Sequence, residues 1–474
     1  MRVGCAARFV RRGAVLVACL GAAAPASAQG ALDAATATRV DAAVQSVLAR
    51  SGAPSASIAI VQGGAITYAN AYGSAHVGPP SVAATPAMRY SIGSISKQFT
   101  SVALLLLAEE GRLSLDDRVS KWFPELTRAG DITIRQLLSM TSGYQDYWPQ
   151  DYVMPDMLKD VTPAGIMRGW AQKPLDFEPG TRWQYRNPNY VLAGQIAERV
   201  AGGPLLALLR ERVFTPLQMT SVVDTDQAAL GPGDPMRYRR FALGPPREAP
   251  KEGKGWLSAA GELAMTASDL ARWNIAMMNR AVLKPASYRE LERETVLANG
   301  APTGYGLGVN VSVLNGRRQI AHGGEVSGFT ARNEVYPDEK TAIVVLVNLD
   351  ASPASNQIAG RIATALSAAA PATDAQRAVE QARAIFAGLQ KGQVDRSLFT
   401  ANMNAYFTPE ALADFSSSLG PLGPAVSVTQ SGQSLRGGMV FRRFAITAGG
   451  RNLAVTAFIM PDGTVEQFLV EPAD

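Results

Sequence analysis

YSIGSISKQFT, residues 90–100, places Ser94 and Lys97 three positions apart as an S-x-x-K pair. An apolar run follows and ends near Gly111, which is the pattern of a helix with a polar start and a glycine stop. Side chains at positions i and i+3 share one face of a helix. The sequence therefore predicts that the Lys97 amine reaches the Ser94 hydroxyl at the first turn of this helix.

A serine hydroxyl becomes an effective nucleophile only when a neighbouring base accepts its proton. Lysine can act as this base when burial or a nearby positive charge lowers the pKa of its amine. An S-x-x-K pair alone is weak support, because a serine near a helix start followed by a solvated lysine gives the same letters. The other motifs of the chain decide between these two interpretations.

The composition indicates a globular protein, since 47% of the 474 residues are hydrophobic and 18% are charged. This length suits two or three domains with a full-sized core. The formal net charge is +5, but residues 1–28 carry four arginines and no acid, and the charge without them is +1. The other Lys and Arg residues are scattered, so we expect no nucleic-acid partner.

Residues 1–28 have the pattern of a signal peptide. Arginines precede a small apolar run, and Ala26-Ser27-Ala28 forms an A-x-A cleavage site. We expect export to the periplasm or secretion and not a membrane anchor, because the apolar run is too short to span a bilayer. No other stretch of the sequence is long and apolar enough, so we expect no transmembrane segment in the mature chain. Residues 16–19 resemble a lipoprotein box and Arg11-Arg12 hints at twin-arginine export, so a lipoprotein form and the export route stay open.

Both cysteines, Cys5 and Cys19, lie inside the predicted signal, which leaves the mature chain without a thiol nucleophile, a disulfide or a thiolate metal site. The chain has two histidines, His76 and His322, and neither lies in an H-E-x-x-H zinc motif. No serine lies in a G-x-S-x-G elbow, which argues against a Ser-His-Asp triad of the α/β-hydrolase kind. No metal or organic cofactor is implied.

Strand patterns lie at both ends of a large first domain, residues 33–368. A helix at 33–49 and a hairpin at 55–72 precede a mainly helical middle, and further strands follow at 306–313, 319–321, 329–336 and 341–348, with a closing helix at 355–366. The fold class is α+β, because the two sets of strands most simply join in one antiparallel sheet with the helical middle as a subdomain. The Pro- and Gly-rich residues 230–255 are a candidate lid or substrate loop.

A linker, residues 369–374, precedes a small α+β domain, residues 375–474, with two predicted helices and a curled antiparallel sheet. Its pattern resembles the cone-shaped folds of the nuclear-transport-factor-2 type. Because it holds no obvious catalytic cluster, we expect a packing or interaction role.

Two further motifs follow the S-x-x-K pair in order: Tyr185-Arg186-Asn187, a Y-x-N, and His322-Gly323-Gly324, an H-x-G. With them the first domain resembles the penicillin-recognising serine hydrolases of the class C β-lactamase family, which carry S-x-x-K, then Y-x-N, then K-T-G or H-x-G. The resemblance implies a β-lactamase/transpeptidase-like fold, with an antiparallel sheet flanked by helices and a mainly helical subdomain, related to the penicillin-binding proteins.

The resemblance also implies catalytic roles. Ser94 would form an acyl-enzyme, while Lys97 and Tyr185 would share the proton transfers, with Tyr185 as a phenolate base if Lys97 lies near its hydroxyl. The backbone N–H groups of Ser94 and Glu325 would form the oxyanion hole, usually the largest catalytic contribution.

The remaining motif residues would bind substrate. Asn187 would contact the substrate or hold Lys97, and His322 would steer or polarise the substrate. Residues 320–325 are predicted to lie at a strand end and turn, where Gly323 and Gly324 would let the substrate lie close to the strand. The alternative for His322 is a hydrogen-bonded structural histidine.

Two departures from the family pattern bear on the substrate. His322 stands where typical class C lactamases have lysine, and a mostly neutral histidine binds a carboxylate less well. In the family, H-x-G occurs in esterases and some D-alanyl peptidases. Arg186 fills the middle of Y-x-N, where it would either supply the missing positive charge or point into solvent.

We therefore predict an exported serine hydrolase that acts on small acyl esters or amides, with a carboxylic ester as the leading substrate. D-alanyl carboxypeptidase or β-lactamase activity is the alternative within this class. A catalytically silent binding protein on the same scaffold is the alternative of another class. The oligomeric state stays open.

Overall fold

A computed structural model describes residues 1, 30–147, 153–314, 316–367 and 374–473. In this part of the chain, seven strands form one antiparallel sheet in the order β3-β2-β1-β12-β11-β10-β9. The prediction that strands from both ends of the first domain join in one sheet is confirmed, because β1 pairs with β12. The strands are β1 (Ser55–Gln62), β2 (Ala65–His76), β3 (Val82–Ala83), β9 (Asn310–Leu314), β10 (Arg317–Val326), β11 (Phe329–Tyr336) and β12 (Thr341–Val347).

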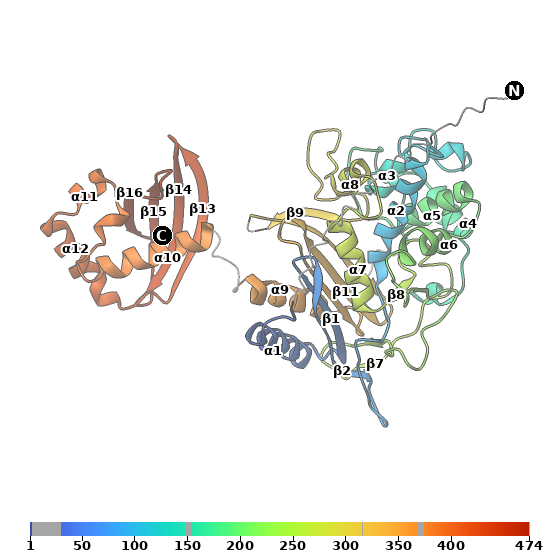
Figure 1. Cartoon of the computed structure of the whole chain (residues 1–474), viewed down its shortest axis with the longest axis horizontal. Coiled ribbons are helices and arrows are strands. Elements are labelled where there is room, and N and C mark those ends of the chain that lie inside the picture. The colour runs from blue at the N-terminus through green and yellow to red at the C-terminus, as the bar shows by residue number, and fades with distance from the viewer. Residues whose placement is uncertain (2–29, 148–152, 315, 368–373, 474) are drawn as a thin grey trace.

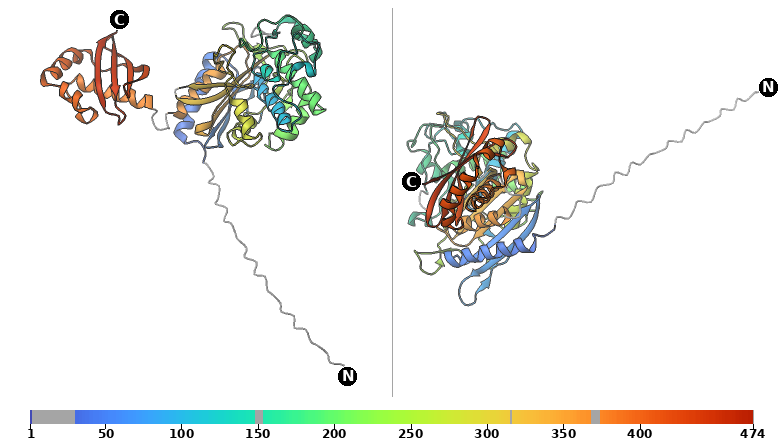
Figure 2. Two further views of the ribbon diagram at one scale, coloured as in Figure 1. Left: turned by 90° about the horizontal axis from the view of Figure 1, so that it is seen from above. Right: turned by 90° about the vertical axis from the view of Figure 1, so that its left-hand side faces the viewer.

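Both faces of the central strands are covered. On β1, Ile58 and Ile60 pack against α1 (Ala34–Ser51) and α9 (Ala354–Ser367), while Ala59 and Val61 join the larger core on the opposite face. Successive side chains of a strand point to opposite faces, so a strand buried on both sides reads as a continuous apolar run. Figure 2 shows α1 and α9 on one side of the sheet and the helical subdomain on the other.

The helical subdomain is built around a buried central helix, α2 (Ser96–Glu109), in which every residue from Ser96 to Leu107 is buried. Helix α7 (Ala267–Met278) packs against β1 and β12, with Thr266 as its N-cap. The other α-helices of this region are α3 (Ile134–Leu138), α4 (Pro163–Ile166), α5 (Asn187–Ala201), α6 (Leu205–Leu209) and α8 (Pro285–Glu292).

Two local predictions around the motifs were wrong. Ser94 lies in a 3-10 turn, Gly93–Ile95, immediately before α2 rather than in the first turn of the α-helix. His322 and the two glycines after it lie within β10 rather than at a strand end, because β10 stays paired with β11 as far as Val326.

Several short strands, one at residues 90–91 and the others within residues 223–265, were not predicted from the sequence. β4 (Tyr90–Ser91), β8 (Leu263–Met265) and β5 (Val223–Asp224) form a small sheet that anchors the chain just before Ser94. Within the predicted loop 230–255, β6 (Tyr238–Arg239) pairs with β7 (Arg247–Glu248). A lid role for this segment stays a prediction.

Residues 374–473 have a hydrophobic core of their own, formed by side chains such as Phe386, Phe444 and Val455 (Figure 1). In the described part of this unit, a four-stranded antiparallel sheet accompanies three α-helices, one more than predicted. The unpredicted helix is α11, whose six residues are too few to show a period. The elements are α10 (Asp374–Leu389), α11 (Ala401–Tyr406), α12 (Pro409–Leu419), β13 (Ser427–Arg436), β14 (Met439–Ala448), β15 (Arg451–Ile459) and β16 (Val465–Pro472).

The predicted signal segment lies, from residue 2 onward, outside the described residues, as do linker residues 369–373. Helices of the described chain are all too short or too polar to span a membrane.

Candidate active site

The Lys97 amine lies at the centre of the site, fully buried, with three hydrogen-bond partners. It contacts Ser94 Oγ at 2.9 Å, Asn187 Oδ1 at 2.9 Å and the Ala260 carbonyl oxygen at 2.8 Å. An ammonium can donate to all three. A neutral amine can instead donate to Asn187 and Ala260 while its lone pair faces the Ser94 hydroxyl, which is the arrangement that a general base needs.

Burial lowers the pKa of Lys97 to about 7, and the charges of Asp146 and Glu262 limit the decrease. The charged form loses its hydration inside the protein, whereas nearby carboxylates favour it. Near neutral pH a large fraction of Lys97 is therefore unprotonated and able to accept the Ser94 proton.

Tyr185 lies beside this pair. The Lys97 nitrogen lies 4.8 Å from the centre of the Tyr185 ring. Burial raises the pKa of Tyr185 well above its ordinary value, and the nearby Ser94 hydroxyl offsets this only in part. The buried phenol oxygen has no hydrogen-bond partner among the described residues. The raised pKa favours the neutral phenol in this state. The catalytic role of Tyr185 stays a prediction.

His322, whose ring centre lies 6.1 Å from that of Tyr185, is also neutral. Its Nδ1 lies 2.5 Å from the Gly323 carbonyl oxygen, which can only accept, so Nδ1 carries the proton. Its Nε2 accepts from the Tyr305 hydroxyl at 3.0 Å. Burial, together with the positive charges of Lys97 and Arg332, lowers the pKa of His322 to about 3, although the hydrogen bond to the Gly323 carbonyl opposes the decrease. His322 therefore carries no positive charge for a substrate carboxylate.

The glycines of the third motif bring β10 against the Ser94 turn. A Cβ on Gly324 would lie 1.8 Å from the Ile92 carbonyl oxygen, and a Cβ on Gly93 would lie 2.6 Å from the Glu325 nitrogen. The space beside Gly324 thus holds the Ile92 backbone, whereas a Cβ on Gly323 would meet nothing closer than 3.8 Å. This close approach places the Glu325 backbone beside the Ser94 turn, as the predicted oxyanion hole requires. The Glu325 side chain accepts a hydrogen bond from the Ala351 N–H.

Arg186 takes neither of the two predicted positions. Its side chain is 7% exposed and donates to Asp176 Oδ2 at 2.5 Å. The guanidinium is buried and paired, so it neither points into solvent nor offers an unpaired positive charge to the site.

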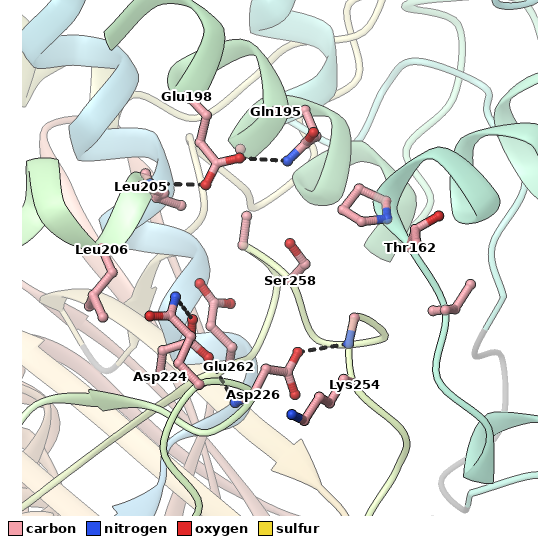
Figure 3. Close-up of a pocket in the computed structure, with 16 residues that line it drawn as sticks. Thr162, Gln195, Glu198, Leu205, Leu206, Asp224, Asp226, Lys254, Ser258 and Glu262 are labelled. Atoms are coloured by element: carbon pink, nitrogen blue, oxygen red, sulfur yellow. Dashed lines mark hydrogen bonds between the residues drawn. The ribbon is translucent and has the colours of Figure 1, made fainter. Parts of the chain in front are cut away.

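An acidic cavity of about 280 Å³ lies behind the segment that carries Ala260. Figure 3 shows the carboxyl groups of Asp224, Asp226 and Glu262 gathered at one end of it. Burial raises the pKa of Glu262 to about 8, with a contribution from the Asp224 charge. Among the acids that line this cavity, Glu262 is the one whose charge acts on Lys97.

Sequence reasoning missed three groups that organise the site. Asp146 holds Asn187, Tyr305 donates to His322, and Ala260 accepts from Lys97. Asp146 and Tyr305 lie outside the three motifs, so both carried at most a weak signal. Ala260 carried none, because it acts through its backbone carbonyl.

Residues 40–368 match the sequence model of the Beta-lactamase family. The chain belongs to this family. The prediction of the family and of its fold is thereby confirmed.

Curated relatives of this family member include a D-aminopeptidase of Brucella canis, 28% identical over 63% of this chain and 57% of its own length. "Protein flp" of Staphylococcus aureus is 29% identical over 66% of this chain and 63% of its own length. The chain thus spans about three fifths of the length of these relatives.

Among solved structures, a D-stereospecific amidohydrolase from Streptomyces sp. matches with 27% identity and a TM-score of 0.59, over 68% of this chain and 96% of that one. The octameric penicillin-binding protein homologue from Pyrococcus abyssi covers 92% of this chain and 98% of its own, with 20% identity and a TM-score of 0.62. At that identity the second match shows the fold alone.

Proposed function

We propose that the protein is a serine amidohydrolase that cleaves small amides through an acyl-enzyme on Ser94. The observation that carries the proposal is the buried Lys97 amine, hydrogen-bonded to Ser94 Oγ at 2.9 Å and with its pKa lowered to about 7. The D-aminopeptidase relatives and the D-stereospecific amidohydrolase structure favour an amide over the ester predicted first.

In the acylation step, the Ser94 oxygen bonds to the substrate carbonyl carbon as its proton passes to Lys97 Nζ. The carbonyl oxygen becomes an oxyanion that accepts from the backbone N–H groups of Ser94 and Glu325. The Tyr185 phenol donates its proton to the departing amine nitrogen and regains one from the Lys97 ammonium. The C–N bond breaks, and an ester to Ser94 remains.

Deacylation reverses these transfers with water as the nucleophile. Lys97, neutral again, accepts a water proton while the hydroxide oxygen bonds to the acyl carbon. The Ser94 oxygen then leaves and takes its proton back from Lys97. A group that accepts a proton and then returns it works best when its pKa lies near the working pH, and the pKa of Lys97 meets this requirement.

The charges around the site favour a substrate without a free carboxylate. His322 is neutral and Arg186 is paired with Asp176, so neither supplies the fixed cation that a β-lactam or a peptide C-terminus would use. An amino acid amide or a similar small amide fits this site better. Esters of the same acyl groups are the second candidate, since an alkoxide leaves with less need for protonation than an amine.

The test compares three chromogenic substrates with the purified protein and with Ser94→Ala. These are a D-alanine p-nitroanilide, a short p-nitrophenyl ester and a cephalosporin. Turnover of the anilide that is lost in Ser94→Ala supports the proposal, and turnover of the ester alone replaces it with the esterase. Efficient cephalosporin hydrolysis would contradict the argument from neutral His322. An unchanged rate in Ser94→Ala would remove the nucleophile assignment.

We also propose that residues 1–28 direct export, on the basis of their arginines, apolar run and A-x-A site. N-terminal sequencing of the protein from fractionated cells checks this. A periplasmic or secreted product that begins at Gln29 supports it, a lipid-modified product that begins at Cys19 selects the lipoprotein route, and a cytoplasmic product with residues 1–28 intact contradicts it.

A further inference from the structure

The Asp146 carboxylate accepts two hydrogen bonds from Asn187. Its Oδ1 accepts from the Asn187 backbone N–H at 2.9 Å, and its Oδ2 accepts from the Asn187 side-chain Nδ2 at 3.4 Å. Asn187 is the first residue of α5, where backbone N–H groups lack partners within the helix and a carboxylate is favoured. Asp146 therefore fixes both the backbone and the side-chain amide of Asn187.

The second of these contacts decides which way the Asn187 amide faces. With Nδ2 directed at Asp146, Oδ1 faces the Lys97 amine and accepts from it at 2.9 Å. A flipped amide would place its NH₂ group against the Lys97 ammonium and its oxygen against the Asp146 carboxylate. Both contacts would be repulsive, because an ammonium has no acceptor and a carboxylate no donor.

The loop that carries Asp146 is anchored beside it. The Tyr147 hydroxyl donates to the Trp256 carbonyl oxygen, and the Tyr147 ring packs edge-on against Trp170 and Trp256, with centres 5.5 and 5.3 Å apart. Tyr147 is 2% exposed. The buried Tyr147 ring next to Asp146 holds the carboxylate at the first residue of α5.

Charge links Asp146 to the catalytic amine as well. Burial raises the pKa of Asp146, while the Asn187 N–H and the charges of Lys97 and Arg186 lower it. The groups around Lys97 on its other sides are the Ser94 hydroxyl, the Ala260 carbonyl, the rings of Tyr185 and Tyr190, the neutral His322, and Glu262. Asp146 and Glu262 are the two acids whose charges raise the pKa of Lys97. Asp146 is also linked to Lys97 by hydrogen bonds through the Asn187 side chain.

We propose that Asp146 is a positioning residue, whose carboxylate fixes the Asn187 amide so that the Lys97 amine stays aimed at Ser94. This inference rests on the proposed function, because it assigns the base of that same reaction its orientation. Asp146 touches neither Ser94 nor the reacting atoms in this scheme, and it acts only through Asn187 and through its charge.

The test uses Asp146→Asn, which keeps the shape and removes the charge. A misplaced base costs about 30- to 100-fold in rate, so we expect kcat to fall by about that factor while KM stays within about 3-fold. The acid limb of the kcat/KM profile should move to lower pH, because loss of a nearby negative charge lowers the pKa of Lys97. A purely structural defect would lower the amount of active enzyme without moving this limb.

Asp176→Asn is the matched control, because Asp176 is the carboxylate partner of Arg186, one residue before Asn187. We expect it to leave kcat and the pH profile unchanged. Asp146→Asn with a wild-type rate and acid limb would overturn the inference, as would equal losses in the two variants.

A double-mutant cycle with Asn187→Ala tests the route of the effect. If Asp146 acts through Asn187, adding Asp146→Asn to Asn187→Ala should lower kcat by less than about 3-fold further, since coupled residues are not additive. Full additivity would overturn the inference.

Labelling with a fluorophosphonate separates the two proposals and does not depend on the substrate. Wild-type protein that fails to label at Ser94 contradicts the proposed function. Wild-type protein that labels at the same rate as Asp146→Asn contradicts only the positioning role.

Discussion

The site contains two buried nitrogen bases, Lys97 on α2 and His322 on β10, and their environments differ. Burial lowers the pKa of both, to about 7 for Lys97 and to about 3 for His322. The acids Asp146 and Glu262 act on Lys97, whereas the charges that act on His322 are the cations Lys97 and Arg332. Burial brings a lysine, whose ordinary pKa is 10.5, into the range of pH 7, and it takes a histidine, whose ordinary pKa is 6.5, well below that range. The acids near Lys97 oppose the decrease of its pKa, whereas the cations near His322 add to the decrease.

The largest expected effect removes the titrating base. Lys97→Met keeps an unbranched side chain in the buried site, and we expect kcat to fall about 10³-fold, within the range for loss of general base catalysis. Lys97→Arg should be equally inactive, because a guanidinium does not deprotonate in proteins. Rates on the anilide substrate measure this, with circular dichroism to confirm folding. Activity retained in Lys97→Arg would show that Lys97 acts only as a cation.

The next variant moves β10 away from the turn that carries Ser94. Gly324→Ala would place a Cβ 1.8 Å from the Ile92 carbonyl oxygen, so β10 must shift away from the Ser94 turn. We expect a loss of about 10²-fold in kcat from the displaced oxyanion hole, and a destabilisation of about 1–3 kcal/mol from overpacking. Kinetics and thermal unfolding measure both.

Gly323→Ala is the control for this variant, because its Cβ would lie 3.8 Å from the Ala331 carbonyl oxygen, an ordinary contact. It should keep a near wild-type rate and midpoint of unfolding. Equal losses in the two variants would show that the strand, and not its distance from Ser94, is what matters.

A smaller effect should show in the pH profile. The base must be neutral to accept the Ser94 proton, so kcat/KM should rise with pH through the pKa of Lys97 and show a midpoint near 7. His322 should add no inflection above pH 5, because the pKa of His322 is about 3. Tyr305→Phe, which removes the donor to His322, should leave the midpoint in place. A midpoint that moves in Tyr305→Phe would mean that His322 titrates in the working range.

The sequence predicted the parts of this site that depend on local spacing or on motif order. Ser94 and Lys97 are close because three positions along a helical turn bring them together. Tyr185 and His322 could be identified only from the order of motifs in the resembling family, and their placement needs the tertiary fold.

Other features needed three-dimensional packing. The neutral state of His322 depends on burial and on the cations Lys97 and Arg332, and its Nε2 accepts from Tyr305, 17 residues away in the chain. The pairing of Arg186 with Asp176 likewise follows from the loop fold and not from the Y-x-N letters. The glycines suggested a strand end, but β10 continues through them because their missing side chains let it lie against Ile92.

The smallest expected effect compares the two acids that act on Lys97. Glu262 has its pKa raised to about 8, so at pH 7 it is mostly protonated and adds little negative charge. Glu262→Gln should therefore move the acid limb of kcat/KM to lower pH by less than Asp146→Asn does, and it should leave kcat on the plateau within about 3-fold, because no hydrogen bond joins Glu262 to Asn187 within the described chain. A larger shift in Glu262→Gln than in Asp146→Asn would mean that Glu262 is ionised at neutral pH, and that the acidic cavity behind Ala260 sets the basicity of Lys97 more than the Asp146 side does.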